Sequence, residues 1–235
     1  MTTQPLPSIR SASADQELAG DFRLPLYRRA LDVLISVGAL VVFLPLGLLI
    51  AIATLIDSGM PVFYVQERVG LDRRGPQLSR FKGRDRRCRV GYGRPIHVYK
   101  FRSMRRDAES ATGAVWAQRK DPRSTRVGRL LRRTHLDEVP QFWNVLRGDM
   151  TIVGPRPERP QLVEELVSVL PDYALRTRVP PGITGMAQIY NGYDDSLDSA
   201  SRKVEYDLYY IRNSSLQLDL QIMAATAGYL VRKKG

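Results

Sequence analysis

Two adjacent carboxylates, Asp137 and Glu138, lie just after the most basic part of this sequence. Pro140 is well tolerated in the first turn of a helix, so we expect the pair near a helix N-terminus, where carboxylates and phosphates are both stabilised. One carboxylate can attack phosphorus while the other holds Mg²⁺, a hard ion that prefers oxygen ligands. Ordinary capping of the helix is the alternative, and it accounts for most acidic pairs of this kind.

Basic side chains suited to phosphate occur on both sides of the acidic pair. Arg156 lies between two prolines in the sequence GPRP (154–157), which hold the backbone extended and present the guanidinium for bidentate phosphate recognition. Lys100 and Arg102 alternate at the end of a predicted strand and would share one face, available to a pyrophosphate. A rigid surface turn and a solvated strand face are the plain alternatives.

Three further polar residues are candidates for substrate contacts. Arg178 precedes a stiff, glycine-punctuated loop, PPGITG (180–185), in which Thr184 and the loop amides would help to hold a nucleotide or a sugar. Asp207, in the sequence EYDLYY, is a candidate for a sugar or metal contact. A polar residue on an exposed helix face explains Asp207 equally simply.

Charge is distributed unevenly along the 235 residues, which carry a net charge of +12. The segment 68–133 contains 21 basic and 5 acidic residues, whereas the remainder is slightly acidic. This concentration is typical of a surface that faces phosphates, anionic lipid or nucleic acid. Cys88 is the only cysteine, so an intrachain disulfide and a thiolate metal cluster are excluded.

The N-terminal region predicts a membrane anchor. Residues 1–22 have the composition of a flexible tail, and residues 31–56 are almost wholly apolar. As one helix this run would measure about 39 Å, more than the roughly 30 Å hydrocarbon core. Pro45 sits just past its middle, and arginines flank both ends, which marks both ends as cytoplasmic. We favour a re-entrant helix–break–helix over 23–58, with a plain bitopic anchor as the open alternative.

The remaining sequence predicts a mixed α and β catalytic domain, mainly α, over 59–235. Short strand patterns at 62–65 and 96–101 indicate a small β-hairpin, separated by a basic loop insertion at 73–94. Helical patterns, some of them amphipathic and suited to the membrane interface, occur at 127–131, 137–147, 160–170, 198–212 and 216–231.

The order of these motifs resembles that of the bacterial sugar transferase family, the monotopic polyprenyl-phosphate phosphoglycosyl transferases. The resemblance runs from about Leu24 to Val231. It is carried by six ordered segments: DSGMPVFYVQERVG, KFRSM, RVGRLLRRTHLDEVPQFWNVLRGDM, VGPRP, PPGITGMAQ and YDLYYI.

The resemblance implies a ping-pong transfer of a phosphosugar. Asp137 would attack the β-phosphate of a UDP-sugar, expel UMP and become a phosphosugar-aspartate, and Glu138 would hold Mg²⁺. A polyprenyl phosphate, usually undecaprenyl phosphate, would then accept the phosphosugar and so begin exopolysaccharide, O-antigen or glycoprotein glycan assembly. Five basic residues match family positions that bind phosphates: Lys100, Arg102, Arg133, Arg156 and Arg178. The family's re-entrant helix resembles residues 25–57, which implies a catalytic domain on the cytoplasmic face of the bacterial inner membrane.

Three features depart from the family pattern. The membrane break is Leu44-Pro45 where Ser-Pro is usual, so the proline alone must supply the kink. His135 replaces a small hydroxyl residue, and we assign it no catalytic role. The segment 73–94 is longer than usual, and we expect it to bind anionic lipid headgroups at about 1 kcal/mol per well-placed charge, with a solvated loop as the alternative.

Two rival functions belong to other classes. A membrane-anchored nucleic-acid binder would use the basic segment but leave the acidic pair and the GPRP sequence without a task, and the sequence has no recognisable nucleic-acid motif. A non-catalytic scaffold for glycan assembly is disfavoured by the intact Asp137–Glu138 pair. The expected partners are therefore a UDP-sugar, a polyprenyl phosphate and anionic lipid, not nucleic acid. A homodimer stays an open alternative.

Overall fold

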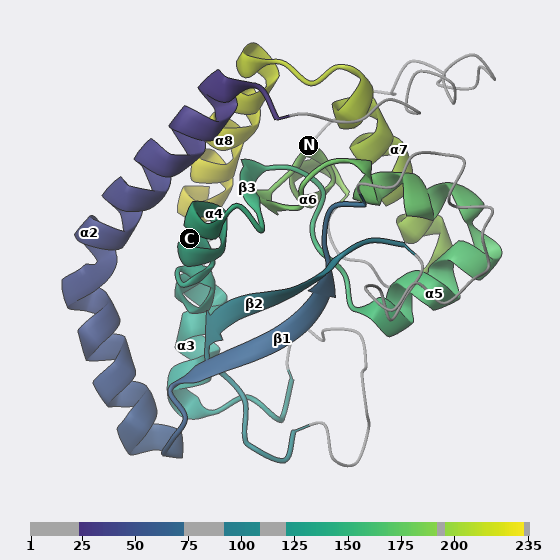
Figure 1. Cartoon of the computed structure of the whole chain (residues 1–235). Helices are drawn as coiled ribbons and strands as arrows, with labels where there is room; N and C mark the ends of the chain where they lie inside the picture. Colours follow the sequence, from purple (N-terminus) through teal and green to yellow (C-terminus); the bar gives the residue numbers. More distant parts are fainter. Residues whose placement is uncertain (1–23, 73–91, 109–120, 192–195, 233–235) are drawn as a thin grey trace.

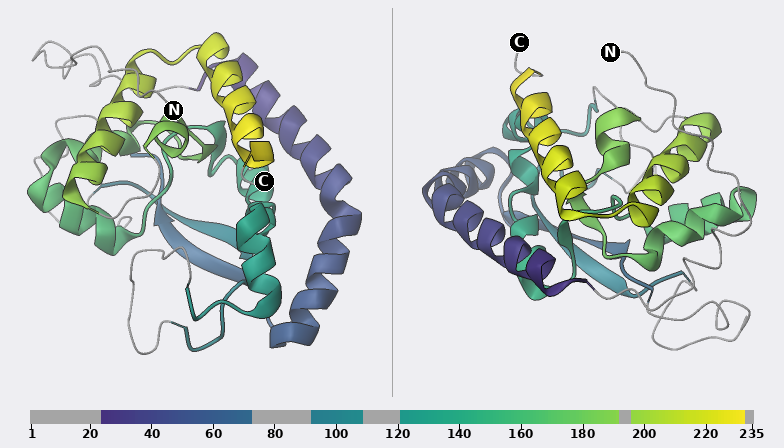
Figure 2. Two further views of the ribbon diagram at one scale, coloured as in Figure 1. Left: turned by 180° about the vertical axis from the view of Figure 1, so that it is seen from behind. Right: turned by 90° about the horizontal axis from the view of Figure 1, so that it is seen from above.

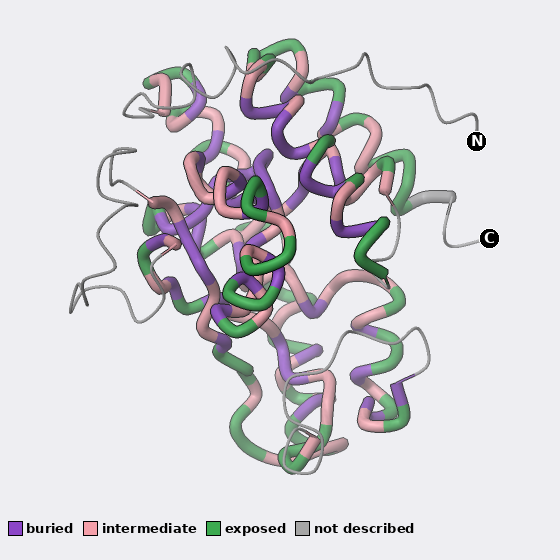
Figure 3. Tube along the Cα trace, turned by 90° about the vertical axis from the view of Figure 1, so that its right-hand side faces the viewer, coloured by how far each residue is buried: buried purple, intermediate pink, exposed green. Residues whose placement is uncertain are grey.

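The computed structural model describes residues 24–72, 92–108, 121–191 and 196–232. The predicted tail (1–22) and most of the basic insertion (73–94) lie outside these ranges, so the expected lipid contact of the insertion stays a prediction. The described part is mixed α and β and mostly helical, as expected. Buried positions gather around the strands, whereas the outer turns of the helices are exposed (Figure 3).

A single long helix, α2 (Leu26–Ser58), runs along one side of the molecule and bows outward at its middle (Figure 1). The expected break into two helices is wrong, because the helix continues through Pro45. Proline lacks the N–H of one helix hydrogen bond, which favours bending at this place. Most apolar side chains of α2 face outward, with Val42 71% and Ile56 81% exposed. The helix is long and apolar enough to cross a membrane.

Polar contacts attach the N-terminal part of α2 to the rest of the protein. The buried carboxylate of Asp32 accepts hydrogen bonds from the Thr151 hydroxyl (2.8 Å) and the Ile152 backbone N–H (3.0 Å). Arg28 forms a buried ion pair with Asp219, 2.7 Å from Nε to Oδ2. This pair holds the start of α2 beside helix α8 (Leu216–Arg232), as two further views show (Figure 2).

The C-terminal end of α2 is attached as well. The buried guanidinium of Arg102 donates from Nη2 to the carbonyl oxygens of Ser58 (2.8 Å) and Gly59. Asp57 accepts the backbone N–H of Val127 at 2.9 Å, in the first turn of helix α3 (Arg126–Thr134). Both ends of the apolar helix are therefore bound to one and the same domain.

The predicted β-hairpin is confirmed. Strands β1 (Phe63–Val69) and β2 (Pro95–Phe101) pair antiparallel, with Tyr64 opposite Lys100. Ile96 and Val98 alternate along β2 and are buried, so this face of the strand packs into the main core. Phe101, on the opposite face, packs with Ile50 of α2 and Leu131 of α3.

A short segment after the hairpin carries the acidic pair. Helix α3 ends at His135, whose left-handed backbone (φ 57°) closes the helix. A 3-10 turn, η2 (Leu136–Glu138), follows and leads into helix α4 (Gln141–Arg147). The expectation that the carboxylates lie just before a helix N-terminus is confirmed.

A second, parallel sheet was not anticipated from the sequence. Strands β3 (Thr151–Val153) and β4 (Gly182–Thr184) are only three residues long, too short to show a pattern. A Cβ on Gly182 would lie 2.2 Å from the backbone N of Gly154, so only glycine allows these two backbone segments to approach this closely.

The remaining helices enclose the core. Helix α5 (Pro160–Val169), the 3-10 segment η3 (Pro171–Arg178), and helices α6 (Met186–Tyr190) and α7 (Leu197–Arg212) follow in chain order. The helices predicted at 160–170, 198–212 and 216–231 are therefore confirmed. They pack on a core built around Val145, Met150, Val163 and Tyr173.

Candidate active site

A cavity of about 1880 Å³ opens between the hairpin, the turn η2, the β3–β4 sheet and helix α8. Asp137 and Glu138 line it together with Lys100, Arg156 and Arg68. Its wall also includes arginines that follow β2 and arginines of α3: Arg105, Arg106, Arg129, Arg132 and Arg133. Carboxylates and many cations therefore share one open cavity.

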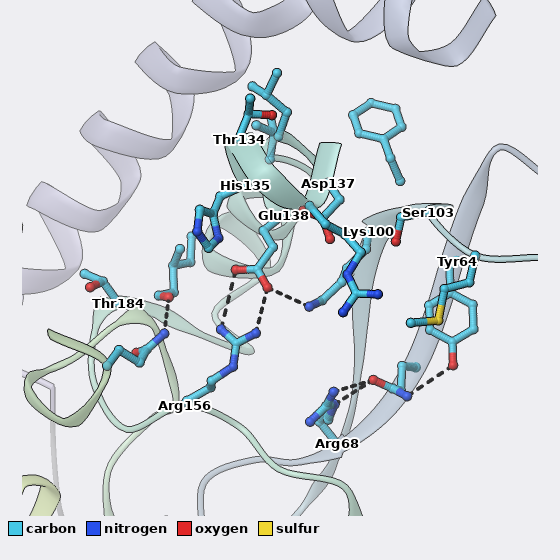
Figure 4. Close-up of a pocket in the computed structure, with 18 of the residues that line it drawn as sticks. Tyr64, Arg68, Lys100, Ser103, Thr134, His135, Asp137, Glu138, Arg156 and Thr184 are labelled. Atoms are coloured by element: carbon cyan, nitrogen blue, oxygen red, sulfur yellow. Dashed lines mark hydrogen bonds and ion pairs between the residues drawn. The ribbon is translucent and has the colours of Figure 1, made fainter. Parts of the chain in front are cut away.

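The centre of the site is the Glu138 carboxylate (Figure 4). Its Oε1 lies 2.7 Å from Lys100 Nζ and 2.7 Å from Arg156 Nη2. Its Oε2 has a longer contact, 3.5 Å, with Arg156 Nη1. Two cations predicted on different segments thus meet at one carboxylate, where β2, η2 and the GPRP sequence converge.

The two carboxylates differ in their electrostatics. Burial disfavours the charged form of Glu138, but Arg156 and Lys100 outweigh it and hold the pKa of Glu138 well below its usual range. Burial raises the pKa of Asp137, and the negative charge of Glu138 raises it further. Asp137 is thus the more basic of the two carboxylates, while Glu138 stays ionised beside the two cations.

The GPRP segment is held mainly through its carbonyl groups, with one further hydrogen bond from the Gly154 N–H to Thr184 O (2.9 Å). Pro155 and Pro157 have no N–H to donate, so the backbone has few other means of attachment. The carbonyl oxygens of residues 155 to 158 accept, in order, from Gly182 N (2.9 Å), Arg176 Nη2 (3.2 Å), Arg68 Nη1 (3.1 Å) and Val69 N (2.8 Å). The rigidity expected of this segment is therefore supplied by its surroundings as well as by its prolines.

A second buried ionic cluster lies behind the GPRP segment. Glu158 accepts from Lys203 Nζ at 2.6 Å, and its other oxygen is 3.5 Å from Arg68. Burial opposes ionisation, but Lys203 and Arg68 outweigh it and lower the pKa of Glu158 to about 2. Arg68 also reaches Gln66, which in turn contacts Tyr64, along the wall of the cavity (Figure 4).

The structure brings some of the predicted site residues together and not others. Lys100, Arg156, Asp137 and Glu138 converge, and Thr184 and Arg133 also line the cavity. Thr184 exchanges a 2.7 Å hydrogen bond with Thr226 of α8.

Two predicted contacts lie away from the cavity, and a third has a structural partner. Arg102 lines the cavity, but its Nη2 donates to the carbonyl oxygens at the C-terminal end of α2. Arg178 does not line the cavity. Asp207 is 1% exposed and pairs with Arg176, 2.7 Å from Oδ2 to Nε. Asp207 therefore contacts a buried arginine rather than the open cavity.

Sequence reasoning missed Arg68, Arg176, Glu158 and Lys203 as parts of the site framework. Their contacts join residues 20 to 90 positions apart in the chain, so no local sequence pattern predicts them. The one available signal was Glu158, which directly follows the GPRP sequence.

His135 lines the cavity beside the acidic pair. Its backbone N–H donates to Leu131 O, so it occupies the C-capping position of α3.

Together, the long apolar helix and the carboxylate pair among cations define a membrane-associated protein with a cavity suited to an anionic substrate. The family model described as "Bacterial sugar transferase" matches residues 24–233, and the chain belongs to this family.

Named relatives share the similarity over most of this chain. UDP-N-acetylgalactosamine-undecaprenyl-phosphate N-acetylgalactosaminephosphotransferase of Aeromonas hydrophila is 40% identical over 86% of this chain and 44% of its own length. UDP-glucose:undecaprenyl-phosphate glucose-1-phosphate transferase of Escherichia coli (strain K12) is 40% identical over 90% of this chain and 41% of its own length. The chain thus spans less than half the length of these two proteins. Exopolysaccharide production protein PSS of Rhizobium leguminosarum bv. phaseoli is 38% identical, over 88% of this chain and 97% of that protein.

Proposed function

We propose that this protein transfers a sugar 1-phosphate from a UDP-sugar to a polyprenyl phosphate, in particular undecaprenyl phosphate, and releases UMP. The observation that carries the proposal is the shared cavity, in which Asp137 has a raised pKa and Glu138 gathers Lys100 and Arg156. The names of two relatives, which specify a UDP-sugar and undecaprenyl phosphate, support these substrates. The product would be the first lipid-linked unit of a polysaccharide.

The reaction proceeds in two displacements at one phosphorus. An oxygen of Asp137 attacks the β-phosphorus of the UDP-sugar, and the bond from that phosphorus to the bridging oxygen breaks, so that UMP leaves with the electron pair. An oxygen of the polyprenyl phosphate then attacks the same phosphorus and displaces Asp137 as a free carboxylate. Lys100 and Arg156 stabilise the negative charge on the phosphoryl oxygens in both steps.

The acidic pair fits Mg²⁺, which proteins commonly bind through one or two carboxylates together with water and substrate phosphates. Among the described residues, no three acidic, histidine or cysteine side chains lie close enough together to hold a metal ion by themselves. Glu138 Oε2 has only a 3.5 Å contact, so Glu138 would hold the ion beside Asp137. When bound, Mg²⁺ would neutralise charge on the pyrophosphate.

A re-entrant α2 is the membrane arrangement that these contacts support. Asp32 and Arg28 bind the N-terminal part of α2 to β3 and α8, and Arg102 binds its C-terminal end to β2. A helix that crossed the bilayer would need its ends on opposite sides, which one water-exposed domain cannot bind at once. The middle of α2 then enters the hydrocarbon, and the cavity faces the cytoplasm beside the acceptor phosphate.

Release of UMP tests the proposal directly. Purified protein with Mg²⁺ and undecaprenyl phosphate should release UMP from one of a panel of UDP-sugars that includes UDP-glucose and UDP-N-acetylgalactosamine. Without the acceptor, UMP should appear as a burst equal to the amount of enzyme, because the phosphosugar stays on Asp137.

Paired aspartate variants sharpen the test. Asp137→Asn should abolish UMP release, whereas Asp149→Asn, a buried aspartate that does not line the cavity, should retain it. Wild-type turnover by Asp137→Asn would rule out the nucleophile, and absence of UMP release with every sugar would rule out the activity.

A further inference from the structure

The position of the Arg156 side chain depends on a backbone that has few attachments of its own. Prolines on both sides of Arg156 remove two N–H donors, and the Arg156 carbonyl oxygen is held by a side chain, Arg176 Nη2, at 3.2 Å. The opposite side of the same residue, its guanidinium, reaches Glu138 at 2.7 Å. A shift of this carbonyl group would therefore move the cation in the active site.

Arg176 is itself fixed on several sides. Its side chain is 4% exposed, its Nε lies 2.7 Å from Asp207 Oδ2, and its guanidinium carbon lies 4.5 Å from the centre of the Tyr173 ring. Asp207 is equally buried, at 2%, so each charge depends on the other for compensation. Neither residue lines the cavity, which excludes a direct contact with a substrate there.

We propose that Arg176 and Asp207 form a positioning pair that sets the location of the Arg156 guanidinium for phosphoryl transfer. This inference rests on the proposed function. Asp207 orients Arg176 through Nε, Arg176 holds the Arg156 carbonyl through Nη2, and Arg156 presents its guanidinium to Glu138 and the phosphates. Lysine cannot replace Arg176. The Nε and Nη2 of Arg176 bind two different partners, Asp207 and the Arg156 carbonyl, and lysine has only one nitrogen to offer.

The test is a double-mutant cycle on the rate of UMP release. Arg176→Lys alone should lower kcat at least about tenfold, because a misplacement of about 1 Å can cost up to 100-fold. In an Arg156→Ala background, which keeps the carbonyl group but removes the guanidinium, Arg176→Lys should have almost no further effect. The same factor in both backgrounds, or an unchanged kcat for Arg176→Lys, would overturn the proposal.

A matched control separates positioning from general loss of stability. Arg28 forms an ion pair with Asp219 at the same distance, 2.7 Å from Nε to Oδ2, and is similarly buried. Arg28→Lys should lower the midpoint of thermal unfolding about as much as Arg176→Lys, but its effect on kcat should be equal with and without Arg156. If Arg176→Lys fails to fold, Asp207→Asn, which preserves the volume, takes its place in the cycle.

A binding measurement keeps this inference separate from the proposed function. Inorganic pyrophosphate, titrated calorimetrically, should bind more weakly to Arg176→Lys than to the wild type, and equally to Arg156→Ala with or without Arg176→Lys. If the wild type releases no UMP from any sugar nucleotide, the proposed function fails. The pyrophosphate affinities of the wild type and the three variants then test the positioning role by themselves. Equal pyrophosphate affinity of the wild type and Arg176→Lys would overturn the positioning role.

Discussion

Lys100 Nζ lies 2.7 Å from Glu138 Oε1, so a residue of β2 neutralises the carboxylate next to the proposed nucleophile. Asp137 therefore faces one negative neighbour and a set of cations, and its pKa depends on both. This dependence makes the pH profile of the reaction a direct report on the site.

The acid limb of the pH–rate profile should follow Asp137. Its pKa is raised by burial and by Glu138, and only the ionised form attacks phosphorus, so the rate should fall as the pH decreases through that raised pKa. Glu138→Gln removes a negative neighbour and should move this limb to lower pH. Lys100→Met removes a positive neighbour and should move it to higher pH. Single-turnover UMP release measures both, with the exposed Glu165→Gln as a control that leaves the limb in place.

Glu158 should contribute stability that disappears in acid. Its pKa is about 2 in the folded protein and 4.5 ordinarily, so its ionised form stabilises the fold above pH 4.5, and this contribution is lost as the pH falls toward 2. The difference corresponds to roughly 3 kcal/mol. Urea unfolding of Glu158→Gln should show a deficit at pH 7 that shrinks between pH 4.5 and 2. A deficit that stays constant over this range would contradict the assignment.

Arg102 should matter for the attachment of α2 rather than for substrate affinity. Arg102→Ala removes the contacts with Ser58 and Gly59 and should cost about 1–3 kcal/mol of unfolding free energy. The KM for the UDP-sugar should remain that of the wild type. Lys100→Ala should instead lower kcat/KM about tenfold or more, because it removes a charged contact of the site. A similar loss of kcat/KM in Arg102→Ala would restore its predicted phosphate contact.

The two ends of α2 should react from the same side of the membrane. In a Cys88→Ala background, Leu26→Cys and Met60→Cys place thiols at positions that are 90% and 62% exposed. A membrane-impermeant maleimide should label both in inverted vesicles and neither in right-side-out vesicles, whereas Leu44→Cys should resist labelling in either. Labelling of the two ends from opposite sides would establish a spanning helix and exclude the re-entrant arrangement.

Local patterns predicted most of the secondary structure but few of the long-range contacts. The apolar run, the hairpin and the amphipathic helices have periods or compositions that a short window reveals, and they were confirmed. The three-residue strands β3 and β4 have no such pattern, and their pairing depends on the close approach of Gly154 and Gly182.

The site could be predicted where chemistry and position coincide. Lys100, Arg156 and the acidic pair were each selected for their chemistry, and all of them line the cavity: Lys100 near the end of β2, the pair in η2 and Arg156 in the loop after β3. Asp207 and Arg102 are as polar as these residues, but each is buried against a partner that is distant in the sequence. Sequence spacing does not reveal that Asp207 pairs with Arg176 or that Arg102 binds the end of α2.

The attachment of α2 at both ends also bears on protein production. Deletion of residues 24–58 would leave the backbone N–H of Ile152, the carbonyl oxygens at the end of α4 that Arg29 binds, and the buried Arg102 without their partners. The hydrophobic helix is thus an internal structural element of the catalytic domain, and a truncated version designed for crystallisation in detergent-free buffer should misfold. Detergent or nanodisc preparations of the intact chain are the appropriate material.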